Sequence, residues 1–451
     1  MLISDLQNKN IVIWGLGQEG TAVLEFLLRH GIGKKLSVYS DSSVEKPREF
    51  SKVEFFSGAD FEKLLPVTDV IVKSPGVSIY KEEIRRAKEK GIAVTSSTDL
   101  FLSEMRRRPQ TVTIGVTGSK GKSTTSSMLY HVLKNLGKDA VLGGNIGAAL
   151  ISLIDEPHDF VVMELSSYQC SDLSVSPQIV LFTNLFPEHI DWHRSHEAYY
   201  RDKVHLIAHQ RPDDVCFVNE KCEKLKKYCA EYQREFLYYN RPGGFAEINN
   251  ILCKDGRPLM YMEDLKLQGY HNLDNIAGVL SVIDYLKLDV TRAVEALKTF
   301  EPLPHRLQKV GKIGDIEFIN DSISTAPETA MAAMSSFNRP LGLILGGYDR
   351  NQDYNELAEK INADSNVKAV ATLFKTGPRI AETLRRHLTR EIVLVEENDF
   401  AKAVGDIYIA LRGQKNGLVL FSPAAPSYDA YKSFVARGNH FIEIVKELSK
   451  K

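Results

Sequence analysis

Short apolar runs without polar alternation recur along almost the whole chain, and no other feature constrains the fold as strongly. Amphipathic segments such as 21–30 and 378–387 lie between them. Strands that are buried on both faces of a parallel sheet have this pattern, because helices cover both faces. The sequence therefore predicts an α/β fold built from βαβ crossovers. The runs are NIVIWG, KLSVYSD, DVIVKSPG, TVTIGVTG, DFVVMELSS, IVLFTN, LGLILGG, VKAVATLF, EIVLVE and GLVLFSPAAP.

Two polar, proline-containing segments interrupt this alternation. Residues 103–110 (SEMRRRPQ) are charged and precede a new apolar run, and residues 300–308 (FEPLPHRLQ) follow a helix-like stretch. A chain of 451 residues is long for a single hydrophobic core. We therefore expect three domains, over residues 1–105, 106–301 and 302–451.

Composition excludes several classes of function. Lys and Arg number 57 against 58 Asp and Glu, so charge gives no reason to expect nucleic acid or an anionic membrane as a partner. The chain has no apolar run long enough for a bilayer and no signal pattern at its start, so we expect a cytoplasmic protein. Its 5 cysteines form no Cys-x-x-Cys pair, which indicates reduced thiols. A coiled-coil seam is absent, and we expect a monomer.

The segment GVTGSKGKST, residues 115–124, has the form of a phosphate-binding loop between a strand and a helix. Gly118 and Gly121 would let the main chain fold around phosphates, and Lys122 would place a cation on the β- and γ-phosphates. The Ser123 hydroxyl would be a ligand of Mg²⁺. Val116 stands where a full Walker A motif has its first glycine, so a chance match in a polar loop is the alternative.

A second glycine turn, GLGQEG at residues 15–20, also lies between a strand and a helix. Its helix N-terminus would offer free amides to a diphosphate, and Asp41 lies where an acid that contacts a ribose is expected. A nucleoside diphosphate and a nicotinamide dinucleotide share this anionic centre. A tight turn without a ligand has the same sequence pattern, so the motif alone leaves three interpretations open.

An ordered series of short motifs spans essentially the whole chain. With this series the sequence resembles the Mur ligase family of ATP-dependent peptidoglycan-precursor ligases, and within it the glutamate-adding, MurD-like members. The family's shortened loop, T-G-x-x-G-K-S/T, accounts for Val116. The resemblance implies an N-terminal Rossmann-like UDP-binding domain, a central P-loop-type ATPase with a mostly parallel sheet, and a C-terminal Rossmann-like domain. The motifs are TGSKGKST, GGNIG, ELSSYQ, TNLFPEHIDWH, YYRDKVHL, HNLDN, LPHR, NDSISTAPE, LGGYDR and SPAAPSYDAYKSFVARGNHF.

The reaction implied by the resemblance joins glutamate to UDP-N-acetylmuramoyl-L-alanine. ATP would phosphorylate the alanyl carboxylate, and the glutamate amine would then attack the acyl phosphate to form an amide, in a step of cell-wall synthesis linked to cell shape and division. Other interpretations are a catalytically inactive protein that binds ATP and the UDP-sugar, a sister ligase that uses L-alanine or folate, and an oxidoreductase. Closure of the domains around the substrates is also expected.

Two Mg²⁺ sites are implied, one held by Ser123 and Glu164 and one by His189 and Lys203. Mg²⁺ prefers hard oxygen ligands, and the matching lysine of the family is usually carbamylated by CO₂, which turns a cation into a carboxylate-like ligand. Without the resemblance, Lys203 would be interpreted as a solvated helix residue and His189 as a structural histidine. The implied catalytic residues are Lys122, His189, Lys203 and Arg350.

The resemblance also assigns three binding sites. We expect the Glu19 carboxylate to point away from the diphosphate, so that its amide can bind. The implied ATP-binding residues are Gly118, Ser119, Lys120, Gly121, Lys122, Ser123, Thr124, Asn272, Asn275, Arg306 and Asp321. The implied UDP-sugar-binding residues are Gly17, Gln18, Glu19, Asp41, Ser42, Ser43, Ser74, Gly76 and Asn145. The implied glutamate-binding residues are Thr325, Arg350, Ser422 and Tyr428.

The glutamate motifs depart from the commonest pattern of the glutamate-adding ligases. Ile323 stands where Asp-Ser-Lys-Ala-Thr has its lysine, and Arg350 replaces the lysine of the next motif. Arg350 would bind a carboxylate through two parallel hydrogen bonds. D-glutamate is the common substrate of such ligases and is our expectation here. L-glutamate is the alternative, because ligases that use it carry segments similar to these.

Overall fold

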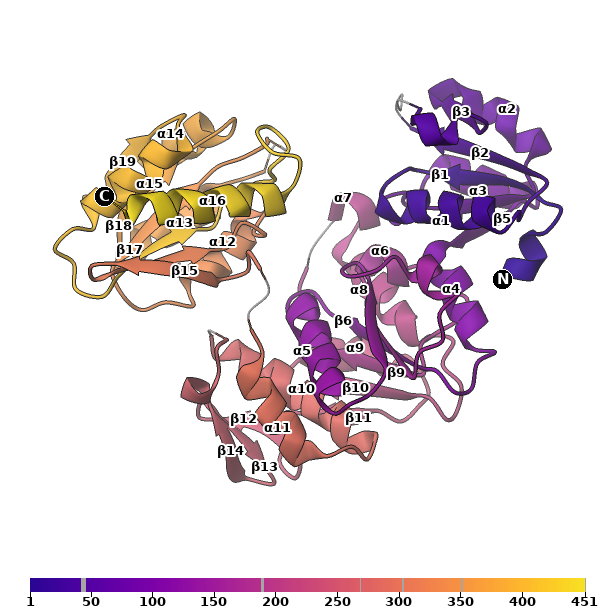
Figure 1. Cartoon of the computed structure of the whole chain (residues 1–451), viewed down its shortest axis with the longest axis horizontal. Helices are drawn as coiled ribbons and strands as arrows, with labels where there is room; N and C mark the ends of the chain where they lie inside the picture. The colour runs from indigo at the N-terminus through magenta and orange to yellow at the C-terminus, as the bar shows by residue number, and fades with distance from the viewer. Residues whose placement is uncertain (42–45, 188–189, 268, 302–303, 350–351, 451) are drawn as a thin grey trace. The chain divides into compact units, whose positions relative to one another are not determined.

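The computed structural model describes residues 1–41, 46–187, 190–267, 269–301, 304–349 and 352–450. The chain forms two compact units, which are described separately: the first comprises Met1–Leu265 and His271–Phe300, and the second comprises Lys266–Tyr270 and Glu301–Lys451. Parallel strands dominate the three large sheets (Figure 1). Over the described ranges, no helix is long and apolar enough to cross a bilayer. All five cysteines are free thiols, as predicted.

The first sheet of unit one has five parallel strands in the order β3-β2-β1-β4-β5. Strand β1 is buried on both faces: Ile11 and Ile13 lie in one apolar cluster, and Val12 and Trp14 lie in another. The prediction of doubly covered strands is therefore confirmed here. The strands are β1 Asn10–Trp14, β2 Lys35–Ser40, β3 Glu54–Ser57, β4 Val70–Lys73 and β5 Ala93–Ser96, and the helices are α1 Gln18–Arg29, α2 Phe61–Leu64, α3 Glu82–Glu89 and α4 Ser97–Met105.

The second sheet of unit one has six parallel strands in the order β11-β10-β9-β6-β8-β7, and a three-stranded antiparallel sheet, β12-β13-β14, follows it. The six strands are β6 Val112–Thr117, β7 Ala140–Gly144, β8 Phe160–Glu164, β9 Ile179–Phe182, β10 Val215–Asn219 and β11 Leu237–Tyr239. The other three are β12 Phe245–Ile248, β13 Ile251–Lys254 and β14 Arg257–Tyr261. The helices are α5 Lys122–Asn135, α6 Ser167–Cys170, α7 Ile190–His193, α8 His196–Val204, α9 Glu223–Cys229, α10 His271–Tyr285 and α11 Val290–Thr299.

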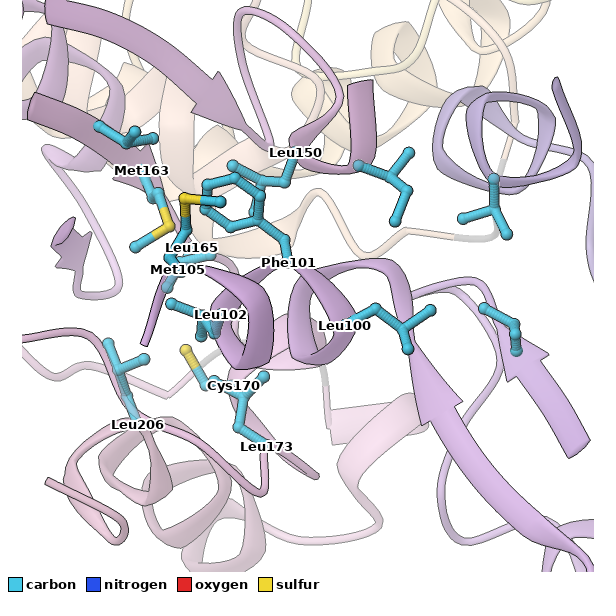
Figure 2. Packing of buried hydrophobic residues seen from close by; sticks show 14 of the residues in the cluster. Leu100, Phe101, Leu102, Met105, Leu150, Met163, Leu165, Cys170, Leu173 and Leu206 are labelled. Atoms are coloured by element: carbon cyan, nitrogen blue, oxygen red, sulfur yellow. The ribbon is translucent and has the colours of Figure 1, made fainter. Parts of the chain in front are cut away.

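One hydrophobic core runs through both large sheets of unit one. Helix α4 follows the last strand of the first sheet, yet its residues Phe101, Leu102 and Met105 belong to the same buried cluster as Met163 and Leu165 of the second sheet region (Figure 2). This shared apolar packing explains why the first 265 residues form one compact unit. The domain limits expected from the sequence remain a prediction.

Unit two contains a six-stranded sheet in the order β15-β16-β20-β17-β18-β19, in which only β15 runs antiparallel to its neighbour. Residues of α12, α13 and α14 pack in one buried cluster, and residues of α15 and α16 pack in another. The strands are β15 Gln308–Ile313, β16 Ile316–Asn320, β17 Leu341–Leu345, β18 Val367–Thr372, β19 Val393–Glu396 and β20 Gly417–Phe421. The helices are α12 Pro327–Met334, α13 Asn355–Ala363, α14 Gly377–His387, α15 Phe400–Ala410 and α16 Phe434–Leu448.

Candidate active site

The predicted phosphate-binding loop connects the end of β6 to the start of α5. Gly118 has a φ of 147° and Gly121 a φ of 81°, a region that side chains rarely allow. A Cβ atom on Gly118 would lie 1.9 Å from the Thr183 Oγ1, so there is no room for one. The loop therefore requires glycine at Gly118 for both its backbone angle and its packing.

We expect Gly118→Ala to lower the midpoint of the first thermal transition by about 5–10 °C, because the added methyl group clashes and the backbone is strained. Gly76→Ala is the control, since a Cβ atom there meets nothing within 4 Å. Calorimetry of both variants checks the expectation. Equal midpoints for the two variants would contradict it.

Two residues that the sequence interpretation missed hold this loop in place. The Thr183 Oγ1 donates to the Lys120 carbonyl oxygen at 2.6 Å, and the Asn184 side chain bonds the Lys120 amide at 2.8 Å and its carbonyl at 3.0 Å. Both residues follow β9, the neighbour of β6. Their place at the carboxyl end of an adjacent parallel strand is the signal that predicts such a role.

Two of the predicted catalytic lysines meet at one carbonyl oxygen of the loop. The Lys122 Nζ donates to the Gly118 oxygen at 2.9 Å and to the Ser119 oxygen at 2.7 Å. The Lys203 Nζ, from α8, donates to the same Gly118 oxygen at 2.9 Å, and its side chain is only 1% exposed. Two cations that converge on one loop create a strongly anion-attracting position.

Glu164 ends β8 and is 1% exposed. The Oε1 of Glu164 accepts a hydrogen bond from the Asn145 Nδ2 at 2.8 Å, while its Oε2 is buried and receives none from the described residues. In nucleotide sites, Mg²⁺ is usually held by one or two carboxylates together with substrate phosphates. A buried carboxylate oxygen without a donor fits such a cation.

The structure describes only some of the other residues predicted to bind Mg²⁺ or ATP. Ser123 lies in the first turn of α5 and is 7% exposed, and β8, which carries Glu164, pairs directly with β6. His189 lies outside the described residues. Within those residues, no cluster of three or more His, Cys, Asp or Glu side chains is arranged to hold a metal. Ser119 and Thr124 are buried, with the Ser119 hydroxyl 2.7 Å from the Phe186 carbonyl oxygen.

Helix α10 brings two predicted ATP-binding residues together. Asn275 lies against the loop, because a Cβ atom on Gly121 would be 2.9 Å from its Oδ1. The Asn275 Nδ2 also donates to the Asn272 Oδ1 at 3.2 Å, and both side chains are buried. The structure thus joins HNLDN to the loop, although the contacting residues Gly121 and Asn275 are far apart in the sequence.

The first glycine turn is held by another predicted residue. The Ser74 hydroxyl donates to the Gly15 carbonyl oxygen at 2.8 Å, and Gly15 has a φ of 90°. Helix α1 begins at Gln18 with Gly17 as its N-cap, so its free amides lie at this turn. Asp41 pairs with Lys81 at 3.2 Å, while Ser42 and Ser43 lie outside the described residues.

Glu19 points toward the second sheet region. Its Oε1 accepts from the Gln169 Nε2 at 2.6 Å, and its Oε2 is buried without a partner among the described residues. Burial raises the pKa of the Glu19 carboxyl from 4.5 to about 7, although the bond from Gln169 and the charge of Lys73 act in the opposite direction. Gln169, in ELSSYQ, was missed as a contact because nothing local links it to residue 19.

The raised pKa of Glu19 predicts a pH-dependent stability. The unfolded carboxyl loses its proton near pH 4.5 and the folded one near pH 7, so stability falls as the pH rises through this window. We expect Glu19→Gln to stabilise the protein at pH 8 by at most about 3 kcal/mol and to have little effect at pH 4. Glu25→Gln, exposed on the same helix, is the control, and thermal unfolding at both pH values is the measurement. A gain that is equal at both pH values would refute this interpretation.

In unit two, the predicted residues lie at the carboxyl ends of neighbouring strands. Asp321 follows β16 and Ser422 follows β20, and these strands lead to helices in different packing clusters, α12 and α16. In open α/β sheets, ligands bind beyond the carboxyl ends of neighbouring strands whose connections lead in opposite directions. The two buried side chains touch each other, because the Ser422 Oγ donates to the Asp321 Oδ2 at 2.8 Å.

Asp321 is the centre of this group. Burial raises the pKa of its carboxyl to about 6, against the bonds from Ser324 and Ser422 and the charge of Arg306. Thr325 is partly buried, and its carbonyl oxygen accepts from Gln352. Of the other residues predicted to contact glutamate, Tyr428 is 62% exposed, and Arg350 lies outside the described residues.

Two family models match the chain: one described as the Mur ligase middle domain over residues 116–283, and one described as the Mur ligase MurD-like N-terminal domain over residues 9–96. The UDP-N-acetylmuramoyl-L-alanine–L-glutamate ligase of Xanthomonas euvesicatoria pv. vesicatoria (strain 85-10) is 34% identical over 457 residues, with 98% of this chain and 96% of that protein covered. The UDP-N-acetylmuramoylalanine–D-glutamate ligase of Clostridium kluyveri (strain ATCC 8527) is 31% identical, with 98% and 97% covered.

The fold has solved counterparts. The crystal structure of UDP-N-acetylmuramate-alanine ligase MurC from Thermotoga maritima has a TM-score of 0.58 and 19% identity, and the match covers 98% of this chain and 100% of that chain. At this identity the likeness shows the fold, and it confirms the predicted α/β class.

Proposed function

The chain belongs to the Mur ligase family of ATP-dependent amide-bond-forming enzymes, and from that premise we propose that it joins glutamate to UDP-N-acetylmuramoyl-L-alanine in peptidoglycan-precursor synthesis. The observation that carries the proposal is the convergence of Lys122 and Lys203 on the Gly118 oxygen. It lies in the loop between β6 and α5, and Glu164 ends the strand paired with β6.

The main difficulty of this reaction is electrostatic, because an anionic carboxylate must approach an anionic triphosphate. Positioning and cations supply most of the catalysis in phosphoryl transfer. Lys122 would bind the β- and γ-phosphates, and the amides of the loop and of the first turn of α5 would hold the phosphate oxygens. Ser123 and Glu164 would hold Mg²⁺, which supplies charge neutralisation when bound. The γ-phosphoryl group would pass to the alanyl carboxylate, and glutamate would displace phosphate from the acyl phosphate.

The proposal also includes a chemical modification of Lys203. As an ammonium it shares an acceptor with Lys122, an arrangement in which two like charges repel. Reaction of its amine with CO₂ would give a carbamate and a proton, which replaces the repulsion by attraction and provides oxygen ligands for a second Mg²⁺ together with His189. A carbamate signal in ¹³C NMR after equilibration with ¹³CO₂, absent from Lys203→Ala, would support this step. Identical spectra for the two proteins would refute it.

The glutamate enantiomer is also a proposal. The sequence favoured D-glutamate, whereas the relative named for L-glutamate is 34% identical and the one named for D-glutamate is 31% identical. Ile323 at the usual lysine position agrees with a changed glutamate site. We therefore place L-glutamate first and keep D-glutamate as the second candidate.

The deciding experiment measures ADP release with each substrate left out in turn, with D- and L-glutamate assayed in parallel. We expect ADP only when the UDP-sugar and one enantiomer are both present, and a product heavier by one glutamyl residue. No turnover with intact ATP binding would favour the inactive binding protein instead, and ADP release that does not require glutamate would contradict the glutamate-adding reaction. Saturable NADH binding would favour the oxidoreductase. Cytoplasmic location, a link to cell division, a monomeric state and domain closure belong to the same proposal.

A further inference from the structure

A chain of four hydrogen-bonded side chains, here called the Asp202 chain, lies in the interior of unit one. The Ser167 Oγ is 2.9 Å from the His193 Nε2, and the His193 Nδ1 is 2.6 Å from the Asp202 Oδ2. The Tyr80 hydroxyl donates to both Asp202 oxygens, at 2.9 and 3.0 Å. These residues come from four separate segments of the sequence.

The chemistry of the groups sets the direction of these bonds. The Asp202 carboxylate only accepts, so the His193 Nδ1 must carry the proton that it shares with Asp202. In neutral His193 the Nε2 is then an acceptor, and the Ser167 hydroxyl donates to it. Every polar atom of the imidazole is thereby used, which fixes the ring in one orientation.

The Asp202 chain resembles a Ser-His-Asp triad, but its surroundings assign it another task. In hydrolases that arrangement activates the serine toward a substrate. Here Ser167 is 2% exposed and His193 is 0% exposed, and the imidazole packs against the rings of Tyr168, Trp192 and Tyr199. A substrate has no access to the hydroxyl, so these bonds act on the positions of the segments that they join.

The segments joined are those that carry the proposed catalytic groups. Asp202 immediately precedes Lys203 in α8, and Ser167, the first residue of α6, lies three residues after Glu164, which ends β8. Tyr80 belongs to the first sheet region, which carries the glycine turn proposed for the UDP-sugar. The same junction holds two further bonds: the Ser78 Oγ donates to the Trp192 carbonyl oxygen at 3.0 Å, and the Trp192 Nε1 donates to the Gly76 oxygen at 3.1 Å.

We propose that Asp202 is a positioning residue of the ligase: through His193 and Ser167 it fixes α8 relative to the end of β8, so that Lys203 and Glu164 keep their places, and through Tyr80 it links them to the UDP-sugar domain. This inference rests on the proposed function. Neither Asp202 nor Tyr80 touches the phosphate-binding loop by a hydrogen bond between described residues, so their effect on the reaction is indirect.

The test compares Asp202→Asn and Tyr80→Phe with two matched controls. Each kcat is calculated per amount of folded protein. Asp202→Asn should lower kcat about 30-fold or more and leave the KM for glutamate within about twofold. Tyr80→Phe removes one hydroxyl and should lower kcat about fivefold and raise the KM for the UDP-sugar by a similar factor. Glu197→Gln, on the 66% exposed side chain of the same helix, and Tyr39→Phe, whose hydroxyl bonds the Gly58 oxygen within the first sheet region, should change each constant less than about twofold.

A second measurement does not depend on turnover. Calorimetric titration with Mg²⁺ and ADP should show at least about fivefold weaker binding for Asp202→Asn than for Glu197→Gln, because displaced Glu164 and Lys203 lie at the nucleotide loop. Wild-type-like kcat in folded Asp202→Asn, or equal losses in kcat and all KM values, would overturn the positioning role. If Asp202→Asn does not fold, an unchanged kcat and KM in Tyr80→Phe would overturn it. Failure of the wild-type protein to form the amide would instead refute the proposed function, and the titration would still decide the role of Asp202.

Discussion

Lys122→Ala is expected to lower the rate of glutamate-dependent ADP formation by about 10³-fold or more. The Lys122 ammonium is held within the phosphate-binding loop by the carbonyl oxygens of Gly118 and Ser119, at 2.9 and 2.7 Å. It is therefore already positioned where phosphates would bind, and little rearrangement is needed for it to exchange a carbonyl oxygen for a phosphate oxygen. Alanine leaves the negative charge of the triphosphate without this cation as the alanyl carboxylate approaches.

Steady-state kinetics with saturating UDP-sugar and glutamate provide the measurement. Lys134→Ala is the control, because Lys134 is exposed in the last turn of the same helix α5. Its rate should stay within about twofold of the wild-type rate. A Lys122→Ala enzyme with a nearly normal rate would show that the loop does not act on the transferred phosphoryl group.

Glu164→Gln is expected to separate activity from stability. The carboxylate is buried, and its Oε2 has no donor among the described residues. A buried carboxylate oxygen without a donor is unfavourable in the free protein, so a neutral amide of the same shape should leave the thermal midpoint unchanged or raise it. An amide nitrogen directed at a cation position repels Mg²⁺, and the rate should fall about 10²- to 10³-fold.

Two measurements on one sample test this expectation: the thermal midpoint without ligands and the rate as a function of Mg²⁺ concentration. Glu156→Gln, in which the original side chain is 75% exposed, should match the wild type in both. A Glu164→Gln protein that loses stability and activity together would assign Glu164 a structural role. A variant that keeps both would remove it from the metal site.

The fold class could be predicted from local pattern alone. The runs NIVIW, VTIGVT and GLVLF became β1, β6 and β20, because a strand covered on both faces needs apolar side chains in succession, and this requirement is visible in any short window. The glycine loop could also be predicted from the local sequence, since Gly118 and Gly121 have backbone angles that other residues avoid. Both inferences concern neighbours in the sequence.

Other predicted residues proved to have partners that the sequence did not indicate. Asn145 was assigned to the UDP-sugar, yet its side chain donates to Glu164. The Ser422 hydroxyl was assigned to glutamate and donates to Asp321. These contacts join segments that follow different strands, so only the order of strands in the sheet determines which of them meet.

The sequence by itself determined that this chain forms parallel sheets, carries a glycine loop suited to phosphate and belongs with ligases of one family, because each of these is written in short ordered stretches of residues. Only the tertiary structure decided that Lys122 and Lys203 share one carbonyl oxygen, that Glu19 meets Gln169, and that Asp202 joins Tyr80 to His193. The physical reason is the distance along the chain: such contacts depend on burial and on which strand ends lie side by side, and neither is encoded in a local pattern.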